Sequence, residues 1–478
     1  MLETMASQAK TTTHAKASEY AGKRVHLIGV GGSGMRALAH MLLVRGAAVS
    51  GSDREAGEAI DGLAASGAKV FVGQRAENLP DKADLVVHSA AINDQNVELA
   101  AARARGVEVL KYSQMLGRLM QDTCGIAVAG THGKSTTSGM MAYALSAAGR
   151  SPSFIVGATV TQLSSPSGVG RGPHFVAEAC EYDRSFLNLC PTLAAILNIE
   201  EDHLDYFPDL AAIVGAFHDF AAKLPPHGVL IANGQDENVA EAVRNIACEV
   251  QTFGVAEHCR WRAENLHCQS GLYSFDIVFD GKLFTHIDLL LAGLHNATNA
   301  LAAAALLHHA GLSGQEISKA LGAFEGTQRR MTVKAQIRGM TVVDDYAHHP
   351  TEIQVTLKAI RERFTPRRLV CVFQPHQHSR TRFLLKDFAR SFAAADRVIV
   401  PDIYFVRDSQ LERDHISAAD LVAQIRLNGR DAQYLKDFAS IARHLEESLA
   451  PGDLVVTMGA GNIWEVADEI VRWLGSDR

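Results

Sequence analysis

No stretch of this sequence is apolar for long enough to cross a membrane. The longest apolar runs, such as residues 300–307, fall far short of the ~20 residues that a spanning helix needs. The first twenty residues are polar, and no apolar segment follows them. Residues 1–22 are therefore expected to form a disordered tail and not a secretory signal.

An excess of basic residues is also missing. The formal net charge is −7, so the chain has no electrostatic footprint for nucleic acid. There is no internal repeat, low-complexity tract or long run of charge, while 47% hydrophobic and 21% charged residues are ordinary for a globular protein. Neither a nucleic acid nor a membrane is expected as a partner.

Paired cysteines are the third absence. The seven cysteines are scattered and odd in number, and no C-x-x-C pair occurs. This pattern argues against a disulfide framework and against a structural zinc site. Reduced thiols in a cytoplasmic protein are the expected reading.

Strand and helix patterns alternate along most of the 478 residues, which predicts an α/β protein of several domains. Residues 23–121 and 331–478 each read as a Rossmann-like unit of parallel strands and helices. Residues 122–330 read as a P-loop ATPase-like domain, with a mixed sheet because residues 250–290 alternate like hairpins. We therefore expect three domains after the tail at 1–22.

The segment AVAGTHGKSTTSGMM is the most informative in the chain. A strand runs into a glycine-lysine turn and then into a helix, which is the layout of a phosphate-binding loop. Backbone N–H groups at the helix start can hold phosphate oxygens, Lys134 can neutralise the β- and γ-phosphates, and a following hydroxyl can bind Mg²⁺. The spacing departs from G-x-x-x-x-G-K-[ST], because Val128 stands at the first glycine position. The candidate ATP-binding residues of this loop are Gly130, Thr131, His132, Gly133, Lys134, Ser135 and Thr136.

A second glycine turn, GVGGSG at 29–34, follows the first strand. It satisfies G-x-G-x-x-G, and Asp53 lies 19 residues past Gly34. Taken alone, this turn favours NAD and an oxidoreductase, but a UDP-sugar pyrophosphate on the helix N-terminus fits equally well. The loop at 130–136 favours ATP-driven chemistry. The candidate substrate residues of this turn are Gly29, Gly31, Gly32, Ser33, Gly34 and Asp53.

Over residues 23 to 470 the motifs resemble those of the Mur ligase family, whose ATP loop reads G-T-x-G-K-[ST]. EACEYDRSF at 178–186, NIEEDHLDYF at 198–207 and GLHNATNALAA at 293–303 are similar to the family's acidic, E-x-D-H and adenine-contacting segments. Three departures stand out: Cys180 where aspartate is expected, and Ser135 and Ala347 in place of the commoner threonine and glycine.

Three further segments resemble the members that add alanine: GVGGSGM at 29–35, DDYAHHPTE at 344–352 and FQPHQHSRTR at 373–382. The resemblance implies cytoplasmic, ATP- and Mg²⁺-dependent joining of L-alanine to the carboxylate of UDP-N-acetylmuramate through an acyl phosphate, in peptidoglycan synthesis. The murein tripeptide-recycling ligases share the HHPT motif and remain an alternative, as does the oxidoreductase. We expect a monomer or a weak homodimer.

The resemblance also implies roles for single residues. Ser135, Glu178 and His203 would hold magnesium, and Lys134, Glu178, His203, His348 and Arg380 would be catalytic. His295 and Asn296 would contact adenine, although HNATN also reads as a helix N-cap. Asp344 or Asp345 would bind the ribose, and Arg330 would reach the phosphates. The alanine and muramyl carboxylate site would be shaped by Tyr346, His348, His376 and Arg380.

Overall fold

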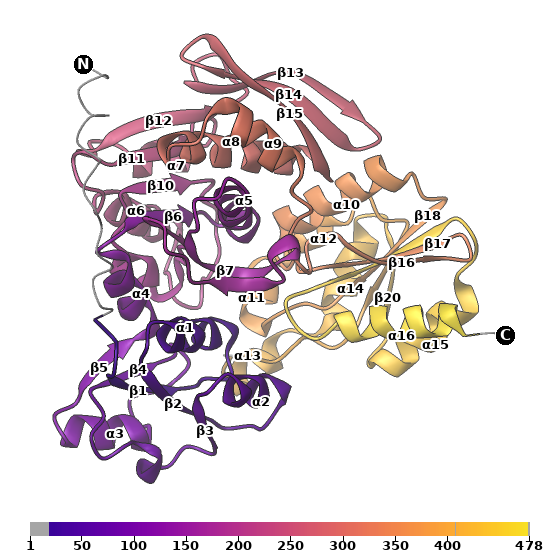
Figure 1. Cartoon of the computed structure of the whole chain (residues 1–478). Coiled ribbons are helices and arrows are strands. Elements are labelled where there is room, and N and C mark those ends of the chain that lie inside the picture. The colour runs from indigo at the N-terminus through magenta and orange to yellow at the C-terminus, as the bar shows by residue number, and fades with distance from the viewer. Residues whose placement is uncertain (1–18, 407, 477–478) are drawn as a thin grey trace. The chain divides into compact units, whose positions relative to one another are not determined.

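The computed structural model describes residues 19–406 and 408–476 (Figure 1). Residues 1–18, most of the expected tail, lie outside the described part. Residues 19–22 of the expected tail are structured: Tyr20 is buried, and the Gly22 N–H donates to the Gly46 carbonyl at 2.8 Å. The chain divides into two compact units, up to Leu116 and from Gly117. Among the described residues, no helix has the length and apolar character needed to cross a membrane.

The first unit contains a five-stranded, wholly parallel sheet in the order β3-β2-β1-β4-β5. The expected βαβ unit is present as β1, α1 and β2. Buried Val and Leu side chains on β1 and β4 form the centre of the sheet. Its elements are β1 Arg24–Ile28, α1 Ser33–Val44, β2 Ala48–Asp53, α2 Glu58–Ala65, β3 Lys69–Val72, β4 Leu85–His88, α3 Val97–Ala104 and β5 Glu108–Lys111.

The second unit begins with a ten-stranded mixed sheet in the order β15-β14-β13-β12-β11-β10-β6-β9-β7-β8. Its middle is parallel, and β13, β14 and β15 form the expected antiparallel hairpins. Along β15, Ile287 and Leu289 are buried while Asp288 and Leu290 are exposed, which is the period-two pattern of a sheet with one solvated face. The strands are β6 Cys124–Ala129, β7 Ser153–Val160, β8 Ser165–Gly168, β9 His174–Glu178, β10 Leu193–Ile196, β11 Val229–Asn233, β12 Glu249–Gly254, β13 Trp261–Gln269, β14 Leu272–Phe279 and β15 Lys282–Ala292.

Two helices cover the core of this sheet. α5 and α8 are buried on nearly all sides, and the run of alanines in α8 lets the two helices and the strands approach closely. Such helices show no amphipathic stripe because both faces meet protein. The helices of this part are α5 Lys134–Ala147, α6 Leu210–Ala221, α7 Glu237–Ala242, α8 Leu294–His309 and α9 Gly314–Gly322.

The remaining sheet of the second unit has six strands in the order β16-β17-β21-β18-β19-β20, all parallel except the β16–β17 pair. Helices α10, α12 and α14 pack on one face, and α15 and α16 pack on the other (Figure 1). This three-layer arrangement is the predicted Rossmann-like unit. Its elements are β16 Thr332–Ile337, β17 Met340–Asp345, α10 Pro350–Phe364, β18 Arg368–Phe373, α11 His378–Phe383, α12 Leu385–Ser391, β19 Arg397–Val400, α13 Gln410–His415, α14 Ala418–Leu427, β20 Asp431–Tyr434, α15 Phe438–Ser448, β21 Asp453–Met458 and α16 Trp464–Gly475.

Candidate active site

The loop between β6 and α5 depends on two glycines with positive φ. Gly130 has φ +144° and Gly133, the N-cap of α5, has φ +81°. A Cβ at Gly133 would lie 2.5 Å from Oδ1 of Asn299, so a side chain is excluded by both backbone strain and space. The loop therefore brings its backbone close to the helix α8.

Asn198, which follows β10, holds this loop in place through hydrogen bonds. Its Oδ1 accepts from the His132 N–H at 2.7 Å, and its Nδ2 donates to the His132 carbonyl at 3.2 Å. The Thr131 N–H donates to the Asn198 carbonyl at 3.0 Å. A neutral amide thus fixes the loop without adding negative charge near it.

Lys134 points back over its own loop. Its ammonium donates to the carbonyls of Gly130 and Thr131 and pairs with the buried Glu181 at 2.9 Å. Burial opposes the charge, but attraction to Glu181 outweighs it and raises the pKa of Lys134. The lysine is therefore a fixed cation at the start of α5.

A pocket of about 660 Å³ opens beside the loop within the second unit. It joins residues of the central sheet domain with residues that follow position 330. This volume is typical of a small-molecule site. Seven of the predicted cofactor residues line it: His132, Gly133, Thr136, His295, Asn296, Arg330 and Asp345.

The predicted adenine residues lie at the start of α8. Burial lowers the pKa of His295 to about 4, so its imidazole is neutral at pH 7. The Asn296 side chain donates to the Ala292 carbonyl at 2.8 Å. The interpretation of HNATN as the helix N-cap is wrong: the cap is Gly293, with φ +95° and no side-chain cap hydrogen bond, and Asn296 and Asn299 are buried.

Of the two aspartates considered for the ribose, only Asp345 lines the pocket. Its carboxylate accepts from the N–H groups of Met331 and Ala347, both at 2.7 Å, and burial raises its pKa to about 6. Asp344 is instead occupied by Arg329 and by the Thr457 hydroxyl. Arg330 pairs with Glu352 at 3.3 Å.

A second cluster gathers the predicted catalytic residues next to Lys134. Arg380 donates from Nε and Nη2 to Oδ1 of Asp202, at 3.0 and 2.7 Å, and both side chains are buried. His203 has φ +55°, and its Nε2 lies 3.8 Å from Glu181 and 3.7 Å from Asp202. The Arg380 guanidinium holds the pKa of Asp202 below its usual range despite burial, so the carboxylate stays charged.

The predicted carboxylate-binding residues border this cluster. Burial lowers the pKa of His348 to about 4, and its ring meets those of Tyr346 and His376 at centroid distances of 5.3 and 6.1 Å. Nη1 of Arg380 lies 3.5 Å from Nδ1 of His376. Four residues predicted from two separate motifs, at 344–352 and 373–382, are therefore neighbours.

Of the predicted magnesium residues, Glu178 ends β9 and Ser135 lies in the first turn of α5, which follows the neighbouring strand β6. β6 and β9 pair in parallel with Val128 opposite Glu178, so this carboxylate lies level with the start of the loop. Its Oε2 accepts from the Gly157 N–H at 2.8 Å. Ser135 is buried in the first turn of α5. The carboxylate that directly faces Lys134 and His203 is Glu181, which sequence reasoning did not select.

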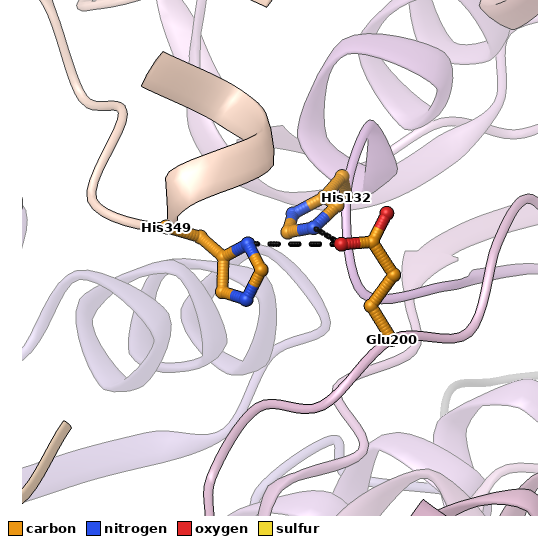
Figure 2. Close-up of side chains that lie close together, drawn as sticks. All are labelled: His132, Glu200 and His349. Atoms are coloured by element: carbon orange, nitrogen blue, oxygen red, sulfur yellow. Dashed lines mark ion pairs between the residues drawn. The ribbon is translucent and has the colours of Figure 1, made fainter. Parts of the chain in front are cut away.

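His132 lies between two acids, Glu200 at 3.4 Å from Nε2 and Glu352 at 3.6 Å from Nδ1. Burial alone would lower the pKa of His132, but these carboxylates raise it to about 9. His349, the N-cap of α10, comes within 3.8 Å of Glu200 (Figure 2). A positive imidazolium therefore lies in the nucleotide loop at neutral pH.

The glycine turn of the first unit is tied differently. The Gly31 N–H donates to Oδ2 of Asp53 at 2.7 Å, and Gly29 has φ +81°. Gly32 is the N-cap of α1, which begins at Ser33. A Cβ at Gly34 would lie 2.9 Å from the Tyr112 ring. Five of the six predicted residues thus belong to one strand–turn–helix, and the sixth, Asp53, ends the next strand, β2.

Three family models match the chain. They are described as the Mur ligase family catalytic domain, over residues 24–123, the Mur ligase middle domain, over 128–307, and the Mur ligase glutamate ligase domain, over 329–461.

Single proteins are similar over nearly the full length. A UDP-N-acetylmuramate–L-alanine ligase of Caldanaerobacter subterraneus is 41% identical, covering 94% of this chain and 97% of that protein. The crystal structure of a UDP-N-acetylmuramate–alanine ligase from Thermotoga maritima has a TM-score of 0.79 at 26% identity, covering 95% of this chain and 100% of that one. A murein peptide ligase from Psychrobacter arcticus has a TM-score of 0.72 at 25% identity, covering 96% and 100%.

Proposed function

The chain belongs to the Mur ligase family, and on that premise we propose that it joins L-alanine to the carboxylate of UDP-N-acetylmuramate with cleavage of ATP to ADP and inorganic phosphate. The observation that carries the proposal is the full-length similarity to relatives named for this activity. The oxidoreductase alternative falls away, because the glycine turn at 29–34 lies inside a Mur ligase match.

The chemistry requires activation, because a carboxylate is a poor electrophile. A muramyl carboxylate oxygen attacks the γ-phosphorus, ADP leaves, and an acyl phosphate forms. The alanine amine then attacks the acyl carbon and expels inorganic phosphate, which keeps the former carboxylate oxygen. Both first reactants are anionic, so positive charge must screen them.

Lys134 supplies fixed positive charge for this step. It is buried, cationic and held against the loop by Glu181. We propose that it pairs with the β- and γ-phosphates, while Gly133 and Thr136 contact ATP from the loop side of the pocket. His295, Asn296 and Asp345 then belong to the nucleoside end, with Arg330 nearer the phosphates.

Magnesium fits the residues assigned to it. Ser135 and Glu178 offer the oxygen donors that Mg²⁺ prefers; Glu178 ends β9, and Ser135 lies in the first turn of α5, which follows the adjacent strand β6. His203 offers a nitrogen donor beside Glu181. Bound Mg²⁺ supplies charge neutralisation on the ATP phosphates.

The carboxylate site is proposed around His348, His376 and Arg380. The fork of Arg380 is already engaged by Asp202, so the side that remains for an anion is Nη1, next to His376. His348 is neutral and enclosed by Tyr346 and His376, which suits close approach of an uncharged amine.

Release of ADP measured with UDP-N-acetylmuramate and one amino component at a time tests the proposal. L-Alanine should give the highest kcat/KM. Glycine lacks the methyl group, which is worth about 1–3 kcal/mol in an apolar pocket, and should be lower by about 10- to 200-fold. L-Serine adds a hydroxyl to that carbon and should be lower by roughly 100-fold. A murein tripeptide as the preferred amine would instead favour the recycling ligases, to which the structure is also similar.

A further inference from the structure

Three donor side chains meet at the edge of the nucleotide pocket, from places far apart in the sequence. His132 lies in the loop before α5, Glu200 follows β10, and His349 caps α10 (Figure 2). Oε2 of Glu200 is 3.4 Å from Nε2 of His132 and 3.8 Å from Nδ1 of His349, and all three donor atoms lie within 4.8 Å of one another. Tetrahedral Zn²⁺, with bonds of about 2.0–2.1 Å, places its ligand atoms roughly 3.4 Å apart.

The other ring nitrogen of each histidine already has an acceptor. Nδ1 of His132 faces Glu352 at 3.6 Å, and Nε2 of His349 donates to the Glu201 carbonyl at 3.0 Å. Metal-binding histidines almost always direct their second N–H to a carboxylate or a carbonyl, which fixes the ring and its tautomer. The contacts of these second ring nitrogens do not follow from the three donor distances, so they support a metal site independently.

We propose that His132, Glu200 and His349 bind one transition-metal ion of the Zn²⁺ type, with an open coordination position facing the nucleotide pocket. Two nitrogen donors and one carboxylate suit Zn²⁺ and disfavour Mg²⁺, which selects oxygen. The site uses none of the residues assigned to magnesium. Glu200, Thr351 and Glu352 line the pocket, so the open position is accessible to a nucleotide phosphate or to water.

Binding has two costs in this structure. The Thr351 N–H donates to Nδ1 of His349 at 3.3 Å and must give up that long hydrogen bond. His132 carries a proton at neutral pH and must release it, because a metal binds only the neutral ring. Both costs are local, and neither requires rearrangement of β10 or α10.

The test is equilibrium dialysis of the full chain against Zn²⁺ in the presence of excess Mg²⁺. His349→Asn keeps a good helix N-cap and removes the nitrogen ligand, so it should bind Zn²⁺ at least about 10-fold more weakly than the wild type. Glu352→Gln removes the outer carboxylate and should weaken binding about 10- to 100-fold. Unchanged melting temperatures without metal would show that both variants fold.

The matched control is His286→Asn. His286 is half exposed and lies 2.7 Å from Asp276 and 3.4 Å from Asp288, so it offers similar donors without enclosure. This variant should keep the wild-type affinity. Co²⁺ in place of Zn²⁺ should give the visible bands of a tetrahedral site without thiolate charge transfer, which separates this site from the cysteines. Equal Zn²⁺ affinity in the wild type and His349→Asn, or thiolate bands, would overturn the proposal.

Discussion

The two glycine turns share a strand–turn–helix layout, but different side chains form hydrogen bonds to their backbones. In the first, the carboxylate of Asp53 accepts from the Gly31 N–H. In the second, the neutral amide of Asn198 holds His132, and Lys134 adds a fixed cation. A carboxylate next to the backbone suits hydroxyl donors of a sugar, whereas an amide and a lysine suit a triphosphate. A glycine pattern therefore predicts a nucleotide loop, and the side chain that forms hydrogen bonds to the loop indicates which group the loop binds.

The largest expected effect is at Lys134. Lys134→Ala should lower kcat for ADP release by about 100- to 1,000-fold, because it removes a buried cation aimed at developing charge. Binding of UDP-N-acetylmuramate should not change. Lys134→Ala leaves the buried carboxylate of Glu181 without its lysine partner, which by itself lowers stability. The double variant Lys134→Ala, Glu181→Gln removes that buried charge and is therefore the control for stability. Near-normal turnover in Lys134→Ala would show that ATP does not bind at this loop.

The next effect compares the two glycines directly. Gly133→Ala should raise KM for ATP strongly, since it adds strain at φ +81° and a contact of 2.5 Å with Asn299. Gly31→Ala should raise KM for the UDP substrate more weakly, because the nearest contacts of its Cβ, from 2.8 Å, are with the Asp53 side chain. Steady-state kinetics with each substrate varied in turn separates the two. A reversed pattern would mean that the loops are assigned the wrong way round.

A smaller crossover is expected for the residues that tie the loops. Asn198→Ala should weaken ATP and Asp53→Ala the UDP substrate, each by roughly 5- to 100-fold if one or two hydrogen bonds worth about 1–3 kcal/mol are lost. Calorimetric titration of each ligand measures this. If both variants weakened both ligands equally, the two loops would not be specific.

The smallest expected effect is on the pH dependence of stability, and it is confined to the first unit. Glu98 is fully buried and accepts from Ser52 at 2.5 Å and from Asn78 at 2.7 Å, next to the strands that carry the first loop. Burial opposes its charge, but hydrogen bonds from His26, Ser52 and Asn78 lower its pKa below the ordinary value. Its stabilisation is therefore present above about pH 4.5 and is lost as pH falls through the lowered pKa.

Glu98→Gln should cost about 1–3 kcal/mol and flatten the acid dependence of the first unit's unfolding. Thermal unfolding followed from pH 3 to pH 7 tests this. If the stability of Glu98→Gln fell as steeply at low pH as that of the wild type, the acid dependence would come from other carboxylates.

Local patterns were enough to predict the three sheets and the loop at 130–136, because each depends on residues within one strand–turn–helix. The sequence pattern did not predict the strands β7 and β8, because Gly157 and the serines between positions 164 and 167 interrupt the alternation typical of a strand. The sequence did not predict that Asn198 and Glu181 contact the loop at 130–136. These contacts join residues 47 to 66 positions apart, so they depend on how β6, β9 and β10 pair.

Protonation states were equally out of reach. His132 and His348 both lie in family-like motifs, yet the pKa of one is raised to about 9 and that of the other lowered to about 4. His132 meets two carboxylates, whereas at His348 burial, together with Arg380 and Arg330, outweighs the attraction of Glu352 and Asp202. Sequence shows which histidines are present, while the neighbours that set their charge come from distant segments.

The most direct test of the account follows the oxygen of the substrate carboxylate. UDP-N-acetylmuramate labelled with ¹⁸O in its carboxylate is incubated with the wild-type chain, ATP, Mg²⁺ and L-alanine, and the inorganic phosphate is analysed by mass spectrometry. If the γ-phosphoryl group of ATP on the second loop is transferred to that carboxylate, each phosphate released with an amide product carries one ¹⁸O atom. Amide product accompanied by unlabelled phosphate would contradict the acyl phosphate route.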